Sequence, residues 1–218
     1  MTGCNNMRVS EVFFSLQGEG PQLGLPAWFI RFSGCNLECS WCDSKYAKKG
    51  IDTSVYKIIS DLEQKEDEEN VYCKNIILTG GEPLLQKDLL KLIKMFGDRK
   101  FYIETNGTIY KQEIIGFATF IVSPKLQFLN PKYIEALRKW STVSSFKFVI
   151  GSKKDFDQAV NLCKELNKFD DVYFMPMGTN EKVLKNRMLS IAEWIKELGW
   201  GQLTMRMQVY LWGLKRKT

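Results

Sequence analysis

The chain has 218 residues, of which 44% are hydrophobic and 26% charged, with a formal net charge of +6 and no histidine. This composition is that of a folded globular protein, so we expect one domain over residues 1–218. The missing histidine excludes Ser-His-Asp catalysis, Cys-His catalysis and every metal site built on imidazole. No apolar run approaches the roughly 20 residues of a membrane span, and Met1–Arg8 lacks a secretory pattern, so we expect a cytoplasmic protein.

Short β-branched and aromatic runs alternate along the chain with amphipathic helical patterns. The predicted strands are 27–32, 75–79, 101–105, 120–123, 145–150, 172–175 and 204–210. The predicted helices are 54–64, 87–96, 131–140, 155–167 and 182–198, and the acidic run 63–69 is interpreted as the solvated end of a helix. The alternation predicts an α/β protein with a parallel sheet and right-handed crossovers.

The length refines this prediction. Because 218 residues is short for eight βα units, we expect a partial, open, TIM-like (β/α) barrel of about six parallel strands. Functional residues in such folds lie on the loops that follow the carboxyl ends of the strands. The motifs below occupy that position.

Six cysteines in a chain expected to be cytoplasmic indicate metal binding or catalysis rather than disulfides. Cys4, Cys73 and Cys163 stand alone in the sequence, and we interpret them as free thiols, the last two buried. The other three follow the predicted strand 27–32 as Cys35, Cys39 and Cys42, in a C-x3-C-x2-C pattern.

This cysteine triple favours an iron–sulfur cluster. Structural zinc prefers four ligands, and no fourth cysteine or histidine is near, so a three-thiolate zinc site is the weaker alternative. Thiolate-rich sites otherwise hold iron–sulfur clusters. Three cysteines on a [4Fe–4S] cubane leave one iron without a protein ligand, and the amino and carboxylate groups of S-adenosylmethionine (SAM) are suited to fill that corner.

Three further polar motifs follow predicted strands. Their sequences are Leu-Thr-Gly-Gly-Glu-Pro at 78–83, Ile-Glu-Thr-Asn-Gly at 103–107 and Val-Ser-Pro-Lys at 122–125. Taken alone, the first is a glycine turn that starts a helix, the second an Asn-Gly turn and the third a solvated lysine. Their shared position at strand ends favours a ligand site.

Together these motifs resemble the radical SAM superfamily. The N-terminal part of the chain resembles one family within this superfamily, the 7-carboxy-7-deazaguanine synthases. The segments that carry this resemblance are Glu11–Gly20 (EVFFSLQGEG), Gly24-x-Pro26, Phe29-Ile30-Arg31 and Cys42-Asp43-Ser44. The resemblance implies a radical SAM core and a SAM-dependent ring contraction of 6-carboxy-5,6,7,8-tetrahydropterin to 7-carboxy-7-deazaguanine with loss of ammonia. This reaction belongs to queuosine and 7-deazapurine biosynthesis.

The resemblance also implies the site residues, carried over position by position. The [4Fe–4S] cluster is assigned to Cys35, Cys39 and Cys42. SAM is assigned to Trp41, Cys42, Asp43, Gly81, Glu82, Glu104, Ser123, Pro124 and Lys125. The pterin substrate is assigned to Leu16, Gln17, Gly18, Arg31 and Thr79, and Mg²⁺ to Ser44.

Two positions depart from the family pattern. Ser44 stands where threonine is common, which keeps a hydroxyl oxygen for a hard cation but gives it more rotamer freedom. Met175 stands before Pro176 where many members have glutamine, and it is suited either to an apolar contact with the adenine of SAM or to core packing.

The implied partners are a small-molecule pterin, a flavodoxin-like or other one-electron reductant and a second copy of the chain in a homodimer, with no nucleic acid or membrane. An alternative within the superfamily is an activase of glycyl-radical enzymes, which shares the cysteine triple and the Gly-Gly-Glu motif. A non-enzymatic alternative, a zinc- or cluster-bearing RNA-binding module, is suggested by the positive charge, but Lys and Arg are scattered without interleaved aromatic residues.

Overall fold

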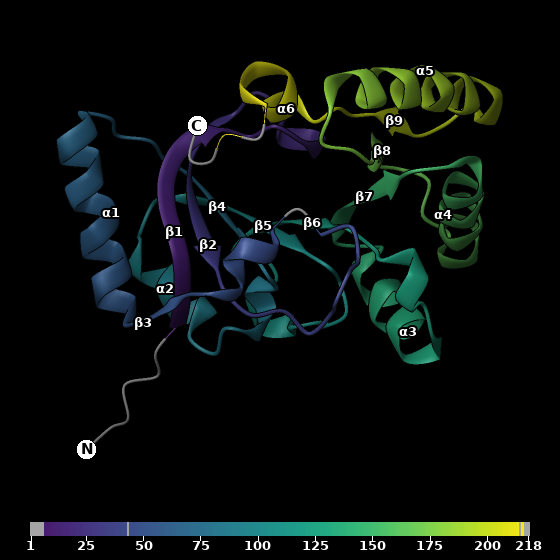
Figure 1. Cartoon of the computed structure of the whole chain (residues 1–218). Coiled ribbons are helices and arrows are strands. Elements are labelled where there is room, and N and C mark those ends of the chain that lie inside the picture. The colour runs from purple at the N-terminus through teal and green to yellow at the C-terminus, as the bar shows by residue number, and fades with distance from the viewer. Residues whose placement is uncertain (1–6, 43, 214, 216–218) are drawn as a thin grey trace. The chain divides into compact units, whose positions relative to one another are not determined.

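A computed structural model describes residues 7–42, 44–213 and 215 (Figure 1). It divides into two compact units. The first comprises the described residues of Met1–Ser15, Pro26–Thr105 and Lys111–Phe120, and the second those of Leu16–Leu25, Asn106–Tyr110 and Ile121–Thr218. The expectation of a single domain over residues 1–218 stays a prediction.

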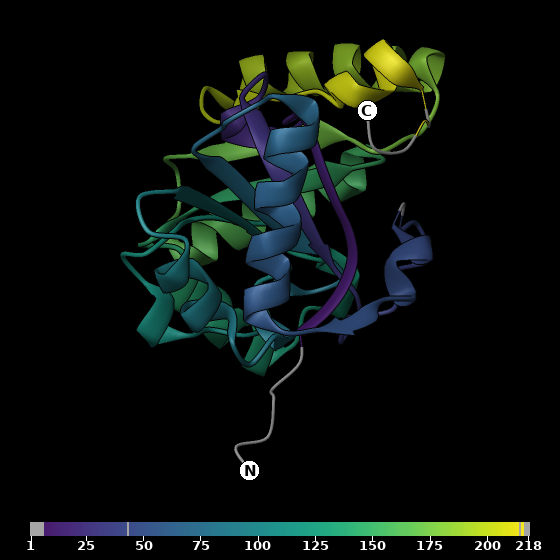
Figure 2. The ribbon, with the colours of Figure 1, turned by 90° about the vertical axis from the view of Figure 1, so that its left-hand side faces the viewer.

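The first unit is built on strands in the order β3-β1-β2-β4-β5-β6. β1 pairs antiparallel with β3, whereas β2 with β4 and β4 with β5 are parallel. Its helices include α1 and α2, and Figure 1 and Figure 2 show α1 running lengthwise beside β1. The bounds are β1 Met7–Leu16, β2 Pro26–Phe32, β3 Ile51–Thr53, α1 Val55–Glu69, β4 Asn75–Gly80, α2 Leu89–Met95, β5 Lys100–Thr105 and β6 Thr119–Val122, with short 3-10 turns η2 Lys45–Lys48, η3 Pro83–Leu85 and η4 Gln112–Ile114.

Alternation along these strands creates two different faces. One face carries fully buried side chains, namely Trp28, Ile30, Phe32, Ile76, Leu78 and Ile103. The opposite face has an apolar cluster of Ala27, Phe29 and Ile77, joined by the less buried Phe13 and Tyr102. The Phe13 and Phe29 rings stack with centroids 5.0 Å apart. At the carboxyl ends of the strands, this second face carries the polar side chains described below.

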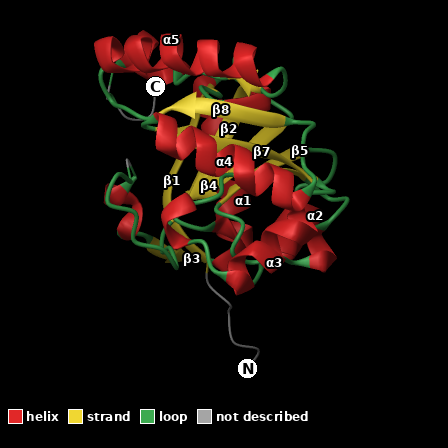
Figure 3. Ribbon diagram, turned by 90° about the vertical axis from the view of Figure 1, so that its right-hand side faces the viewer, coloured by secondary structure: helices red, strands yellow, loops and turns green. Residues whose placement is uncertain are grey.

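The second unit continues from the end of β6 in the order β6-β7-β8-β9, and β7 with β8 and β8 with β9 are parallel. In Figure 3, α4 lies against β7 and α5 runs beside β8. A core of phenylalanine rings joins them, with Phe156 and Phe174 at 4.7 Å between centroids. The bounds are η1 Gly20–Gln22, η5 Leu126–Phe128, α3 Pro131–Trp140, β7 Ser144–Ile150, α4 Lys153–Leu166, β8 Val172–Pro176, α5 Glu181–Leu198, β9 Gln202–Leu203 and α6 Met207–Trp212.

Three helices of the second unit, α3, α4 and α5, begin at capping residues that the sequence supplies. The side chains of Asn130, Ser152 and Asn180 accept hydrogen bonds from backbone N–H groups in the first turns of α3, α4 and α5. α4 is followed by Asn167 and α5 by Gly199, and both of these residues have the left-handed conformation that stops a helix.

Six of the seven predicted strands and all five predicted helices are present at nearly the expected positions. The strand predicted at 204–210 is wrong. Thr204 still donates to the Phe174 carbonyl, but the Met207 N–H donates to the Gly18 carbonyl and the chain turns into α6. These tertiary hydrogen bonds override the local alternation of β-branched and polar residues. The sequence interpretation also missed β1, the three-residue β3 and the two-residue β9.

The strand order is linear among the described residues, with β3 and β9 at its ends, so the sheet is open and mostly parallel. This confirms the predicted fold class, an open (β/α) barrel-like arrangement. Within the same residues, no helix is both long and apolar enough to cross a bilayer. The acidic run ends α1 as expected, except that Glu66 is buried and pairs with Arg99 at 2.6 Å.

Candidate active site

The cysteine loop begins at the carboxyl end of β2, where the prediction placed it. Cys35 is exposed, and Cys39 and Cys42 are half-buried. The Leu37 N–H lies 3.5 Å from the Cys35 sulfur, and the Cys42 N–H donates to the Cys39 carbonyl at 3.2 Å.

The Gly-Gly-Glu motif at the end of β4 packs directly onto the start of the cysteine loop. The Gly81 N–H donates to the Phe32 carbonyl at 3.0 Å and the Glu82 N–H to the Gly34 carbonyl at 2.9 Å. A methyl group on Gly80 would lie 2.1 Å from the Phe32 oxygen, and one on Gly81 2.0 Å from the Gly34 oxygen. Only glycine permits this approach, so the paired glycines join two backbone loops.

Glu82 is fully buried. Its Oε1 accepts a hydrogen bond from the Leu84 N–H at 3.0 Å, which caps η3, and another from the Thr105 hydroxyl at 2.8 Å. The Glu-Pro sequence therefore starts a short helix, as its local pattern indicates, and the carboxylate also ties the end of β4 to the end of β5. Its assignment to SAM stays a prediction.

Arg31 and Thr79, both predicted to bind substrate, are brought together. They are register partners on the parallel strands β2 and β4, so their side chains leave the same face of the sheet. On β5, Glu104 and Tyr102 are two residues apart and point to the same face of the sheet. Tyr102 is the register partner of Ile77 on β4, and Ile77 points to the same face as Thr79. The three polar side chains thus border the apolar cluster at the carboxyl ends of adjacent strands.

The guanidinium of Arg31 is held in a fixed orientation. Its Nε donates to Glu11 Oε2 at 3.0 Å, and the exposed fractions of the two side chains are 15% and 2%. The rings of Phe13 and Tyr46 each lie 5.8 Å from the guanidinium carbon. One charged group is thereby oriented beside an apolar surface, an arrangement suited to an aromatic heterocycle that bears a carboxylate.

The residues around the cysteine loop fit an iron–sulfur cluster by the chemistry of their donor set. Three thiols lie on one loop, and the chain has no imidazole. Cys73 does not add a fourth, because its thiol donates to the Pro26 carbonyl at the other end of β2, and it is half-buried rather than buried as expected. Cys163 is buried in α4, and burial raises the pKa of its thiol to about 12, so it stays protonated. Among the described residues, no three cysteine or acidic side chains converge closely enough to hold a single metal ion.

The remaining residues of this loop are only partly described. Ser44 precedes η2, and its carbonyl accepts from the Ala47 N–H at 2.8 Å. Trp41 is half-buried. Asp43, predicted to contact SAM, lies outside the described residues, and so does Cys4.

In the second unit, the predicted substrate residues lie at the end of β1, which finishes at Leu16, and in the following loop, which starts with Gln17 and Gly18 and is closed by backbone hydrogen bonds. The Gln17 N–H donates to the Leu25 carbonyl at 2.8 Å, and the Gly24 N–H to the Gln17 carbonyl at 2.7 Å. The Gly18 carbonyl accepts from the Met207 N–H at 2.9 Å. The chain after β9 therefore braces this loop.

A charged cluster that the sequence interpretation missed adjoins the loop. Glu19 accepts hydrogen bonds from Lys147 at 3.0 Å, Arg206 at 3.1 Å and Gln208 at 2.7 Å. Burial on its own would raise the pKa of Glu19, but the charges of Lys147 and Arg206 and the hydrogen bonds outweigh it and lower this pKa to about 2. One signal was available, because Lys147 interrupts the predicted apolar strand 145–150 and is buried there.

Ser123, Pro124 and Lys125 follow β6 in the second unit. Ser123 and Pro124 are buried, and the Lys125 ammonium donates to the Ser123 hydroxyl at 2.7 Å. Lys125 is thus partly buried rather than a freely solvated lysine. Met175 is 4% exposed within β8, which agrees with the core-packing interpretation of that residue.

Comparisons with known proteins identify the family of the chain. The family model described as "Radical SAM superfamily" matches residues 29–185. The chain therefore belongs to the radical SAM superfamily, whose members are enzymes that use a [4Fe–4S] cluster and SAM.

Individual relatives identify the family of the chain within this superfamily. A 7-carboxy-7-deazaguanine synthase of Clostridium acetobutylicum is 30% identical over 220 residues, which cover 94% of this chain and 95% of the relative. The synthase of Halobacterium salinarum is 31% identical, with coverage of 94% and 90%. The crystal structure of QueE from Escherichia coli matches with a TM-score of 0.69 at 22% identity, over 93% of this chain and 94% of that one, and supports the fold. The chain belongs to the family of 7-carboxy-7-deazaguanine synthases.

Proposed function

We propose that this enzyme contracts the ring of 6-carboxy-5,6,7,8-tetrahydropterin to 7-carboxy-7-deazaguanine with loss of ammonia. The observation that carries the proposal is the juxtaposition in the first unit. The cysteine loop is joined by backbone hydrogen bonds to the Gly-Gly-Glu loop, and the register pair Arg31 and Thr79 lies at the ends of the same two strands.

Cys35, Cys39 and Cys42 hold the cluster, and the loop around Gly81 and Glu82 receives the methionine end of SAM. When bound, the cluster supplies an electron for SAM cleavage, and SAM supplies the radical that removes hydrogen from the substrate. The other SAM contacts come from Trp41, Asp43 and Glu104, together with Ser123, Pro124 and Lys125.

Arg31 binds the substrate through its planar guanidinium. One of its five N–H donors is engaged by Glu11, which sets the plane of the group, and the remaining donors recognise the carboxylate or a pterin oxygen. Thr79 contributes a hydroxyl next to it. Leu16, Gln17 and Gly18 bind the pterin through a loop whose own backbone hydrogen bonds fix its shape.

Ser44 supplies a hydroxyl oxygen to Mg²⁺, and the substrate carboxylate and water complete the coordination of this hard cation. The enzyme draws its electron from a flavodoxin-like or other one-electron reductant and acts as a homodimer in the cytoplasm, without a nucleic-acid or membrane partner. The product enters queuosine or another 7-deazapurine pathway.

The direct test is anaerobic reconstitution of the cluster, followed by incubation with SAM, Mg²⁺, a chemical reductant and the carboxytetrahydropterin. We expect 7-carboxy-7-deazaguanine and ammonia in equal amounts, identified by mass spectrometry. A reconstituted enzyme that cleaves SAM but leaves the pterin unchanged would contradict the assigned reaction, and one that instead forms a glycyl radical on an added partner would support an activase.

A further inference from the structure

The hydroxyl of Tyr133, on α3, connects two loops of the second unit: the loop that starts at Asn106, after β5, and the loop 123–125, after β6. It accepts a hydrogen bond from the Lys125 N–H at 3.0 Å and donates one to the Asn106 carbonyl. Asn106 belongs to the Glu-Thr-Asn-Gly motif, and Lys125 ends the Ser-Pro-Lys motif. Tyr133 is 4% exposed, so both hydrogen bonds form away from competing water.

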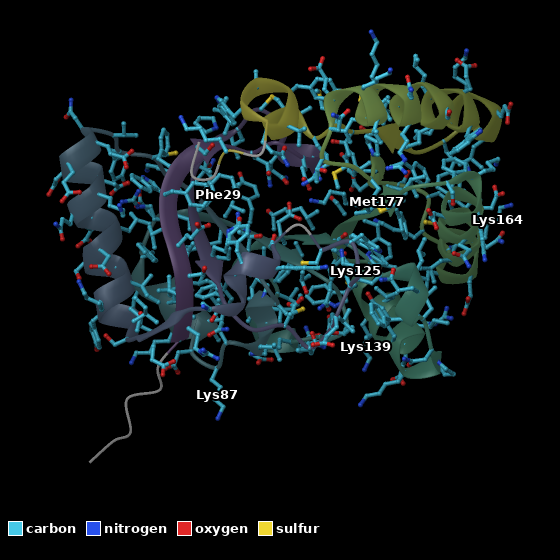
Figure 4. All side chains as sticks on the ribbon, viewed as in Figure 1. Phe29, Lys87, Lys125, Lys139, Lys164 and Met177 are labelled. Atoms are coloured by element: carbon cyan, nitrogen blue, oxygen red, sulfur yellow. The ribbon has the colours of Figure 1, made fainter. Side chains whose placement is uncertain are left out.

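The same face of α3 makes two more contacts with the loop that starts at Asn106. Tyr133, Leu137 and Trp140 are spaced four and three residues apart, and all three are buried. A methyl group on Gly107 would lie 2.9 Å from Leu137, and the Trp140 indole N–H donates to the Ile109 carbonyl at 3.2 Å. Lys139, on the same helix, is exposed, and Figure 4 labels it together with Lys125.

The local structure of each loop makes this bridge effective. The Asn106 side chain accepts from the Thr108 N–H at 2.9 Å, which closes a turn, and the Lys125 ammonium is held by Ser123 at 2.7 Å. Each loop therefore has a hydrogen bond of its own, and the Tyr133 hydroxyl connects one loop to the other. A displacement of about 1 Å at a ligand loop is enough to cost roughly 100-fold in rate.

We propose that Tyr133 is a positioning residue for SAM, which it serves by setting the spacing between the Asn106 and Ser123–Lys125 loops without touching the ligand. This inference rests on the proposed function, in which both motifs contribute to the SAM site. α3 then also fixes the position of these loops, because the Tyr133 hydroxyl hydrogen-bonds to both of them.

The test compares Tyr133→Phe with two control variants. Phenylalanine keeps the ring that fills the buried space and removes only the hydroxyl. Tyr56→Phe removes a hydroxyl from a tyrosine that is 65% exposed on α1. Ile191→Ala destabilises the second unit by emptying a buried position on α5 while leaving the bridge intact.

The first measurement is amide hydrogen exchange on the protein without SAM. We expect the Lys125 amide to exchange at least tenfold faster in Tyr133→Phe, because it loses this acceptor. The Ile134 amide, which donates to the Asn130 carbonyl at 2.9 Å within α3, should keep its rate. Unchanged exchange at Lys125 would overturn the bridge, whether or not the protein binds SAM.

The second measurement is the affinity of the reconstituted enzyme for SAM. We expect Tyr133→Phe to raise the Kd for SAM about tenfold, with a much smaller change in the KM for the pterin, and both controls to leave the Kd unchanged. A Kd that rises equally in Ile191→Ala would assign the effect to general destabilisation and overturn the positioning role. If the unaltered enzyme binds no SAM, the proposed function fails. The exchange rate of the Lys125 amide would still show whether the Tyr133 hydroxyl connects the two loops.

Discussion

The loops proposed to bind the cofactor and the substrate are held in place by different means. In the first unit, the cysteine and Gly-Gly-Glu loops are joined by backbone hydrogen bonds and by glycines that admit no side chain. In the second unit, the loop around Gly18 is bordered by Glu19, which is half-buried and bonded to the buried Lys147 and Arg206 and to Gln208. Steric contacts do not respond to pH, whereas a buried ion cluster does, so the two regions should fail in different ways.

The steric side of this comparison predicts the largest effect. Gly81→Ala places a methyl group 2.0 Å from the Gly34 oxygen, so the two loops must separate. We expect the reconstituted variant to lose activity by about 100-fold or more, with iron content as the second measurement. Gly97→Asn is the control, since nothing lies within 4 Å of that position and asparagine tolerates its left-handed backbone. Full activity of Gly81→Ala would refute the proposed contact between the loops.

The electrostatic side predicts a pH-dependent loss of stability. The pKa of Glu19 is lowered from its ordinary 4.5 to about 2, so ionised Glu19 stabilises the fold above pH 4.5 and this contribution disappears as the pH falls toward 2. The difference in pKa corresponds to roughly 3 kcal/mol of unfolding free energy.

Urea unfolding of Glu19→Gln measures this contribution. We expect a clear loss of stability at pH 7, because Lys147 and Arg206 stay buried without their anion, and a smaller difference from the unaltered protein at pH 3. Glu193→Gln, which breaks an exposed pair with Lys196, serves as the matched control and should change little. An equal difference at both pH values would show that charge is not what Glu19 contributes.

Arg31→Lys sharpens the comparison within the first unit. Lysine keeps the positive charge but loses the planar fork and the orientation imposed by Glu11. We expect the KM for the pterin to rise about tenfold or more, with little change in the Kd for SAM. Arg138→Lys, at an exposed pair with Glu165, is the control. A change in the Kd for SAM with no change in the KM for the pterin would show that Arg31 binds the cofactor and not the substrate.

Ser44→Thr should have the smallest effect. Threonine keeps the hydroxyl and restricts its rotamers, so we expect the Mg²⁺ concentration for half-maximal activity to fall by about two- to threefold. A titration of activity with Mg²⁺ measures it. Identical titration curves for the two enzymes would show that the rotamer freedom of Ser44 does not affect Mg²⁺ binding.

Contiguous motifs made most of the first unit predictable. The cysteine spacing, the paired glycines and the position of each motif after an apolar run could be recognised without knowledge of the fold, because strand ends meet at one edge of a parallel sheet. The pairing of Arg31 with Thr79 required the register of β2 and β4. The function of Glu82 as a link to Thr105 required its burial.

The second unit was less predictable for a physical reason. Glu19 and Arg206 are separated by 187 positions. Their contact depends on the C-terminal segment 204–210, which was predicted as a strand but leads into α6. Local propensity does not contain that information. Lys147 was the one visible sign, because a lysine within an apolar strand needs a buried partner.

The central claim is that three cysteines hold a cubane whose fourth iron is open to SAM. Electron–nuclear double resonance on the reduced, reconstituted protein tests it most directly, with SAM labelled by ¹⁵N in the amino group and ¹⁷O in the carboxylate. We predict hyperfine coupling from both labels, lost in Cys39→Ala. A cluster that shows no coupling to bound SAM, or purified protein that holds a single zinc ion in place of the cluster, would contradict the account.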